Sequence, residues 1–297
     1  MSSTPWLDPQ DIDWLTNAAR RQIAGCRKRA VGGAMLFTPD GVGNYDAHWT
    51  RDFYYMTQVF DLLDAQEVRA GIQYLLDGQR ADGVIPDRRQ ADGVSVYCAG
   101  SPDQPIADVP LDNAAFMVLL VADYVRHTGQ IDLFRANAQR LERAMAGIPL
   151  SDTGLVFNDP AAPHSPYGFT DCIGKTGEEL FCSLLDWRAS NEMARLYAQA
   201  GDMRHAGLFQ ARAQQTAASL GRLWDDDSGM FLAASIDCRQ IDIWGNAFCV
   251  YLDFPLSPAR RESIVAYLTA HVDEITQRGQ IRHLPAGEYW QRLLLPV

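Results

Sequence analysis

The sequence predicts an all-α fold in which helical hairpins stand side by side. Helical patterns dominate the chain, and nearly continuous apolar helices alternate with amphipathic ones. A turn signature also recurs at a regular spacing behind the amphipathic helices. We therefore expect the apolar helices to form an inner layer and the amphipathic helices an outer layer, with short β-hairpin loops at one face.

Apolar periodicity gives about nine candidate helices. They run near 9–28, 50–63, 65–80, 111–128, 131–148, 178–200, 203–224, 242–253 and 258–275. The segment from Phe116 to Val121 is apolar without a break, which predicts a helix buried nearly all round. The next helix mixes Met145 with Arg140 and Arg143, so one of its faces is expected to meet water.

Three similar turns follow the amphipathic helices. They begin at Asp82, Asp152 and Asp227, and each contains a glycine that is expected to adopt positive φ before a short extended piece. The spacings are 70 and 75 residues, which favours an architecture that turns regularly. Because Asp-Gly turns are common, chance recurrence is the alternative.

Four long polar loops join one hairpin to the next inner helix. In a row of hairpins these loops emerge at the same face, and that face is where a site is expected. The loops are 29–49, 81–110, 149–177 and 225–241.

Composition excludes several functions. The 297-residue chain is 47% apolar and carries a formal charge of −11, so its acidic surface repels phosphate backbones and nucleic acid is not expected as a partner. No apolar run approaches the roughly 20 residues of a membrane span, and the N-terminus lacks a signal-peptide pattern, so we expect a cytoplasmic protein. Six scattered cysteines indicate reduced thiols, and no spacing indicates a metal site or a cofactor.

Five segments, in this order, resemble the six-hairpin glycosidase superfamily, which includes trehalases, processing α-glucosidases and glucoamylase-like enzymes. They are Trp49-Thr-Arg-Asp52, Asp82-Gly-Val-Ile-Pro-Asp87, Pro110-Leu-Asp-Asn-Ala-Ala-Phe116, Tyr167-Gly-Phe-Thr-Asp-Cys-Ile-Gly-Lys-Thr-Gly-Glu-Glu-Leu-Phe181 and Leu284-Pro-Ala-Gly-Glu-Tyr-Trp290. The resemblance implies one (α/α)6-type toroid domain over 1–297. A complete toroid has twelve helices, so we expect this chain to lack the last ones.

The resemblance implies that Asp171 is the general acid of glycoside hydrolysis. Burial beside Tyr167 and Phe169 is expected to raise its pKa, which an acid at neutral pH requires, while Lys175 would oppose that shift. The alternative is that Asp171 caps the following helix. Glu288 is the candidate second carboxylate; the alternatives are that it is a plain surface residue, or that the true base lies beyond the chain or does not exist.

A saccharide clamp is expected at the start of the first inner helix. The Trp49 indole offers a flat apolar face, and Arg51 and Asp52 would bind hydroxyl groups through charge-assisted hydrogen bonds. The alternative is a structural Arg–Asp pair with a core tryptophan. The other candidate ligands are Asp87, Asp112, Asn113, Lys175, Trp244, Asn246, Tyr289 and Trp290. Turn and cap roles compete for Asp87, Asp112 and Asn113, and core packing competes for Trp244.

Three functions remain open. The first is an exo-acting, inverting glycoside hydrolase on a small saccharide or glycoside. The second is a non-catalytic or degenerate saccharide-binding protein. The third is a sugar epimerase or isomerase, for which His48 and His164 in the loops would transfer protons. Uncovered apolar flanks of an incomplete toroid also predict self-association.

Overall fold

The computed structural model describes residues 8–294 and confirms the all-α fold. The ends of the predicted domain 1–297, residues 1–7 and 295–297, lie outside the described part. The α-helices are α1 (Pro9–Cys26), α2 (Thr50–Met56), α3 (Ala65–Asp77), α4 (Asn113–Thr128), α5 (Asp132–Ala146), α6 (Leu180–Ala200), α7 (Met203–Ser219), α8 (Ile243–Tyr251), α9 (Pro258–Ala270) and α10 (Val272–Ile275).

The strands are short and form small antiparallel sheets. They pair as β1 (Arg27–Arg29) with β2 (Met35–Phe37), β3 (Ala47–Trp49) with β4 (Arg88–Gln90) and β4 with β5 (Ser95–Val96), β6 (Ala99–Ser101) with β7 (Gln104–Ala107), β8 (Phe157–Asn158) with β9 (Gly177–Glu178), β10 (Trp224–Asp225) with β11 (Met230–Phe231), and β12 (Thr276–Gln277) with β13 (Gln280–Ile281).

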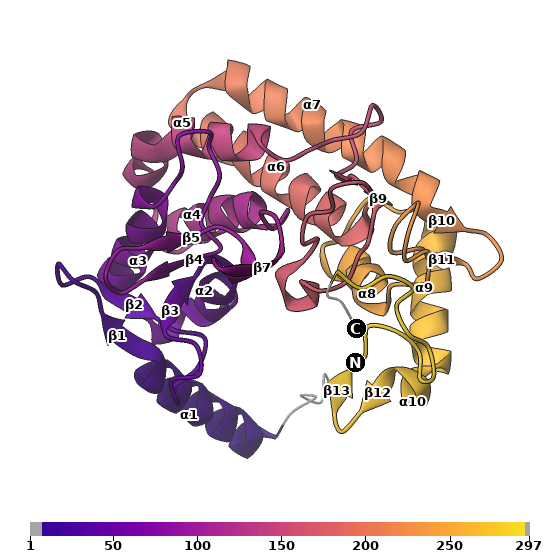
Figure 1. The fold of residues 1–297 in the computed structure, drawn as a ribbon, viewed down its shortest axis with the longest axis horizontal. Coiled ribbons are helices and arrows are strands. Elements are labelled where there is room, and N and C mark those ends of the chain that lie inside the picture. Colours follow the sequence, from indigo (N-terminus) through magenta and orange to yellow (C-terminus); the bar gives the residue numbers. More distant parts are fainter. Residues whose placement is uncertain (1–7, 295–297) are drawn as a thin grey trace.

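The helices lie in an arc around a central space, with α1 and the β12–β13 hairpin at its two ends (Figure 1). The pairs α4/α5, α6/α7 and α8/α9 pack as hairpins, and α4 also contacts α2 and α6. Nearly every residue of α4 from Asn113 to Val125 is buried, whereas α5 buries one stripe and exposes the rest. The predicted alternation of buried inner helices with amphipathic outer helices is therefore confirmed.

Two predicted helices are interrupted. The predicted helix 50–63 divides into α2 and a 3-10 helix, Thr57–Leu62, within which Val59 leaves helical geometry at φ −109° and ψ 46°. The predicted helix 258–275 breaks at His271, which has φ −106° and ψ 19°. Both spans were predicted from apolar periodicity, and this periodicity continues through a local break in helical geometry, so it does not reveal the break.

The recurring turns have the predicted geometry. Gly83, Gly154 and Gly229 have φ of +97°, +87° and +64°. Each glycine N–H donates to a carbonyl three or four residues earlier, which closes a tight turn behind α3, α5 and α7. A side chain at Gly83 would also meet the Arg143 carbonyl oxygen at 2.7 Å. The spacing seen in the sequence therefore reflects a repeated structural unit.

The long loops are joined to one another by backbone hydrogen bonds. β3 pairs with β4, which connects loop 29–49 to loop 81–110. A bridge between Asp108 and His164 connects loop 81–110 to loop 149–177, and the Ile236 N–H donates to the Thr176 carbonyl, which connects loop 225–241 to loop 149–177. The expectation that these loops meet at one face is confirmed. Across residues 8–294, every helix is too short or too polar to cross a bilayer.

We expect Leu120→Ala, on the buried helix α4, to lower the free energy of unfolding by about 2–5 kcal/mol, because it leaves a cavity in the core. The matched control is Leu208→Ala on α7, whose leucine is 58% exposed, and it should change stability by about 0.5 kcal/mol or less. Urea unfolding measures both values. Equal losses would contradict the assignment of inner and outer helices.

Candidate functional site

Arg51 joins three parts of the chain at the start of α2. Its side chain is 2% exposed, and its Nε and Nη2 donate to the two oxygens of Asp112 at 2.7 and 3.1 Å. Nη2 also donates to Asp87 Oδ1 at 3.3 Å. A bidentate pair of this kind fixes the direction of both groups. Arg51 thereby holds α2, the start of α4 and the loop before β4 together.

Asp112 extends this network to loop 149–177. Its Oδ2 accepts a hydrogen bond from the Gly168 N–H at 2.9 Å. A Cβ atom at Gly168 would lie 1.7 Å from Arg51 Cζ, so only glycine allows the loop to approach the guanidinium this closely. The Asp112 side chain makes no cap bond to α4. Asp112 thus stands at the N-cap position of α4, while its carboxylate binds Arg51 and Gly168.

Asp87 connects Arg51 to Trp49. Its second oxygen accepts from Arg88 Nη1 at 3.1 Å, and Arg88 Cζ lies 4.5 Å from the centre of the Trp49 ring. A guanidinium over an indole face is a favourable cation–π contact. Asp87 is buried between two guanidinium groups, so the turn role that competed for it is not what the side chain does.

Asp171 lies beside the same network. Phe169 lies two residues before it, and the centre of the Phe169 ring is 5.6 Å from Arg51 Cζ. The charges of Arg51 and Asp112 both affect the pKa of Asp171. Burial raises the pKa of Asp171, Arg51 opposes the rise and Asp112 adds to it. The opposing cation is therefore Arg51; the expectation that Lys175 plays this part is wrong.

The helix-capping alternative for Asp171 is also wrong. Asp171 ends the 3-10 helix Gly168–Thr170. The residue that caps α6 is Glu179, whose carboxylate accepts from the Cys182 N–H. The Asp171 carboxyl group is thus not committed to a helix terminus.

The site carries an excess of carboxyl groups. Burial raises the pKa of Asp52 to about 6; Asp87 and Asp112 add to the rise and Arg51 opposes it. Because Arg51 pairs with Asp87 and Asp112, the alternative of a structural Arg51–Asp52 pair is wrong. The carboxyl groups are Asp52, Asp87, Asp112 and Asp171, and the guanidinium groups near them are Arg51 and Arg88.

A second buried cluster surrounds Lys175. Its Nζ donates to Asp242 Oδ2 at 2.6 Å, lies 3.8 Å from Glu179 Oε1 and stands 4.9 Å from the centre of the Trp290 ring. Burial raises the pKa of Glu179 to about 7, which Lys175 opposes. Lys175 is 2% exposed. It is enclosed by two carboxylates and the Trp290 ring, so the structure does not place it as a saccharide ligand.

The two segments that carry the predicted catalytic carboxyl groups border one pocket. Glu288, Tyr289 and Trp290 line a pocket of about 480 Å³ together with Phe169 and Cys172, the latter next to Asp171. Backbone hydrogen bonds from Gly174 to Arg292 and from Leu294 to Cys172 join the two segments. Tyr289 is 85% exposed at the rim, where its ring is free to stack on a ligand.

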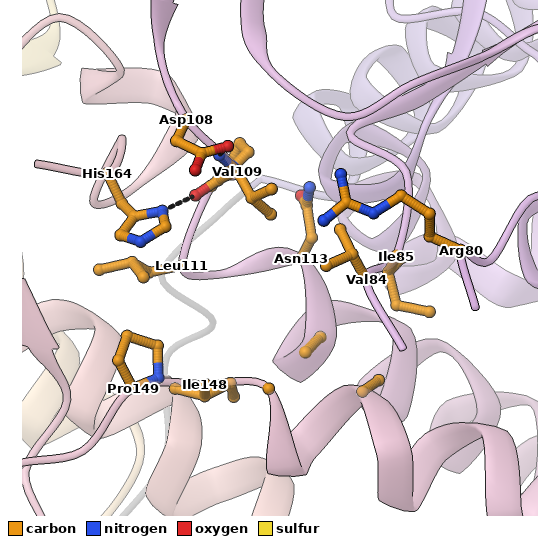
Figure 2. A pocket seen from close by; sticks show the side chains of 14 residues that line it. Arg80, Val84, Ile85, Asp108, Val109, Leu111, Asn113, Ile148, Pro149 and His164 are labelled. Atoms are coloured by element: carbon orange, nitrogen blue, oxygen red, sulfur yellow. Dashed lines mark hydrogen bonds between the residues drawn. The ribbon is translucent and has the colours of Figure 1, made fainter. Parts of the chain in front are cut away.

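Three other predicted ligands make no side-chain hydrogen bond to Arg51 or to its carboxylate partners. Asn246 is fully buried and its amide binds the backbone of Phe231 and Asp242, which makes its role structural. Trp244 stacks on His283 at 3.6 Å and donates to the Ile281 carbonyl. Asn113 points into a different, smaller pocket (Figure 2).

Sequence reasoning missed Glu179, Asp242 and Arg88. An acidic residue directly precedes each of α4, α6 and α8, as Asp112, Glu179 and Asp242. This recurrence was visible in the sequence and marks the ends of the inner helices that meet the loops. Arg88 had no such signal, because its role depends on the pairing of β3 with β4.

In the part of the chain that the structure describes, three or more His, Cys, Asp or Glu side chains never gather in a way that could hold a metal ion. All six cysteines, which lie within that part, are free thiols.

No family model and no curated protein matches the sequence. Among solved structures, the GH63 mannosylglycerate hydrolase from Thermus thermophilus in complex with Tris matches with a TM-score of 0.68 at 12% identity, over 90% of this chain and 83% of that chain. The GH78 family rhamnosidase of Bacillus sp. GL1 matches with 0.66 at 16% identity, over 85% and 25%. The rhamnosidase from Klebsiella oxytoca with rhamnose bound matches with 0.65 at 15% identity, over 79% and 44%.

These matches show the fold. The chain has the helical-hairpin toroid fold of the six-hairpin glycosidases, as the resemblance predicted. It spans a quarter of the length of the first rhamnosidase and less than half of the second.

The raised pKa of Asp52 predicts a pH dependence of stability. The folded protein keeps this proton to about pH 6, whereas the unfolded chain loses it near the ordinary value of 3.8, so ionisation of Asp52 lowers stability as pH rises from 4 to 6. Asp52→Asn removes this contribution and should make the slope less negative by at most about 1.4 kcal/mol per pH unit. Urea unfolding at pH 4, 5, 6 and 7 measures it.

The control for this prediction is Asp61→Asn, since Asp61 is an exposed carboxyl group on the 3-10 helix Thr57–Leu62. It should leave the slope of wild type unchanged. If the unfolding free energies of Asp52→Asn and wild type change in parallel with pH, the carboxyl excess around Arg51 does not destabilise the folded state.

Proposed function

We propose that the protein is a glycoside hydrolase whose active site lies between the Arg51 network and the pocket beside Phe169. The observation that carries the proposal is the position of Asp171. It is a half-buried carboxyl group of raised pKa whose side chain caps no α-helix, and its neighbours Thr170 and Cys172 line a hollow with aromatic sides. Glycoside hydrolysis needs a carboxylic acid that stays protonated near neutral pH and stands beside an apolar sugar-binding surface.

In the proposed mechanism Asp171 donates its proton to the glycosidic oxygen as the bond to the anomeric carbon breaks. Glu288, which lines the same pocket as Thr170 and Cys172 on either side of Asp171, accepts a proton from the water that attacks the anomeric carbon. Inversion requires room for that water, with the two carboxyl groups about 6.5–9.5 Å apart. Asp52 and Trp49 are the proposed hydroxyl and ring contacts, and Arg51 keeps Asp112 and Asp87 in place.

Support for a saccharide substrate comes from what the matched structures are. Their names describe rhamnosidases and a mannosylglycerate hydrolase, one of them with rhamnose bound. A screen for activity should therefore contain rhamnosides, mannosylglycerate, and aryl glucosides and disaccharides of glucose. An exo-acting enzyme releases only the terminal sugar of each.

A non-catalytic saccharide-binding protein is the second candidate. It is favoured by the exposed position of Glu288, which sits at the rim with Tyr289. Calorimetry that shows saccharide binding without turnover would support it. The third class, an epimerase with a histidine pair, has lost its basis. His48 is buried against Phe53 with its pKa lowered to about 4, and His164 lines the other pocket.

We propose one toroid domain over the whole chain and a cytoplasmic location, which rest on composition and on the resemblance. Self-association is proposed through apolar side chains exposed near the ends of the arc. These include Trp14 on α1, Val265 on α9 and Val272 on α10. Sedimentation that shows only monomer would remove that proposal.

We expect Asp171→Asn to lower kcat by a factor of about 10²–10⁴ on a substrate with a poor leaving group while KM changes little, because the amide keeps the shape but has no proton to give. The wild-type rate should fall as pH rises through the raised pKa of Asp171. Steady-state kinetics against pH checks both. The control is Asp152→Asn, an exposed carboxyl group in the same loop. Wild-type activity in Asp171→Asn would remove the mechanism.

A further inference from the structure

We propose that a second pocket, behind the start of α4, is a binding site for a small neutral polyol, with Asn113 as the residue that recognises its hydroxyl groups. The proposal does not depend on the glycoside hydrolase function, because the two pockets share no lining residue and none of the Arg51 network lines the second one.

The second pocket lies where loop 81–110, loop 149–177 and the end of α5 meet, and its volume is about 140 Å³. Figure 2 shows Val84 and Ile85 on one side, Val109 and Leu111 on another, and Ile148 with Pro149 below. The walls are thus largely apolar. They offer contacts to C–H groups, while the charged side chains of Arg80 and Asp108 lie at the rim.

Asn113 supplies an unpaired polar group to this pocket. Its side chain is 1% exposed, and neither Oδ1 nor Nδ2 has a hydrogen-bond partner in the protein. In Figure 2 the amide points into the space between Arg80 and Val109. A buried carboxamide without partners is costly, since it can make hydrogen bonds through two donor hydrogens and an acceptor oxygen. An occupant of the pocket would satisfy it.

The charges at the rim favour a neutral occupant. Arg80 stands on one side, already paired with Asp82 through Nε and Nη2, and Asp108 stands on the other. His164 uses Nδ1 to donate to the Val109 carbonyl. Because the rim has one guanidinium and one carboxylate, the pocket has no strong preference for either sign. Hydroxyl groups can both donate to a carboxylate and accept from a guanidinium.

The volume limits the size of the occupant. The pocket volume is similar to that of a cavity of about 150 Å³ that holds benzene in another protein. Benzene has six non-hydrogen atoms. Glycerol has the same number of non-hydrogen atoms and erythritol has two more. A pyranose has about twice as many as glycerol and would not enter completely. Polyols of three or four carbons therefore match the pocket in size, in alternation of donors and acceptors, and in their C–H faces.

The test follows the side-chain amide resonance of Asn113 by ¹⁵N NMR. The resonance is assigned as the one that disappears from the spectrum of Asn113→Leu. Glycerol and erythritol should shift this resonance in a saturable way at millimolar concentration. Trimethylamine oxide, which stabilises proteins by exclusion from their surface, serves as the co-solvent control and should not shift this resonance in a saturable way. Glucose at equal concentration should give a smaller shift, because it is too large for the pocket.

Thermal unfolding gives an independent readout. Leucine has the shape of asparagine without its unpaired polar atoms, so Asn113→Leu should raise the midpoint of the free protein by about 2 °C and remove the polyol-specific gain. The matched control is Asn137→Leu, because Asn137 is a buried asparagine whose amide binds Gln73 and Leu133. Asn137→Leu should lower the midpoint and keep the polyol response.

A second variant covers the case in which Asn113→Leu does not fold. Ala114→Leu keeps Asn113 and fills the pocket from the first turn of α4, so it should abolish the polyol shift of the Asn113 amide. The proposal is overturned if glycerol and erythritol move that amide no more than trimethylamine oxide does. It is also overturned if Asn113→Leu lowers the midpoint as Asn137→Leu does, since the amide would then be satisfied by bound water alone.

Discussion

The arrangement of this face depends on the buried guanidinium group of Arg51. It pairs with a residue 36 positions away and another 61 positions away, and the backbone of Gly168 approaches it closely. Bringing such distant segments together costs chain entropy, which the hydrophobic packing of the helices offsets. The ion pairs then fix direction: without its carboxylates the buried charge of Arg51 would be strongly unfavourable, so the loops have one arrangement in which this guanidinium is paired.

A second cation repeats this design on the next hairpins. Lys175 stands between Asp242 and Glu179 as Arg51 stands between Asp87 and Asp112. The two clusters differ in what they leave unmatched. Around Arg51 the surplus is shared among carboxyl groups that border a hollow, whereas around Lys175 it is one enclosed oxygen of Glu179 without a hydrogen-bond partner. The first kind of surplus is suited to proton transfer with a ligand, and the second to holding Trp290 and the last loop in place.

Much of the fold followed from the sequence because it rests on local rules. Apolar periodicity distinguished α4 from α5, and the glycines of the three turns had the positive φ that such turns require. The site was predicted less well, since side-chain partners depend on three-dimensional register. The neighbours Arg51 and Asp52 suggested a pair, yet Arg51 turns toward Asp112, which no local rule indicates. Lys175 and Asn246 were misassigned because burial and full hydrogen bonding cannot be read from polar residue types alone.

The most direct test of the account is a double-mutant cycle on Arg51 and Asp112. Free energies of unfolding are measured by urea for wild type, Arg51→Met, Asp112→Asn and the double variant, with the exposed pair Arg69 and Asp132 as the reference cycle. If the buried pair holds the loops together, the coupling energy should exceed about 1 kcal/mol, while the exposed pair should give about 0.5 kcal/mol or less. A coupling energy near zero for Arg51 and Asp112 would contradict the central role given to this guanidinium.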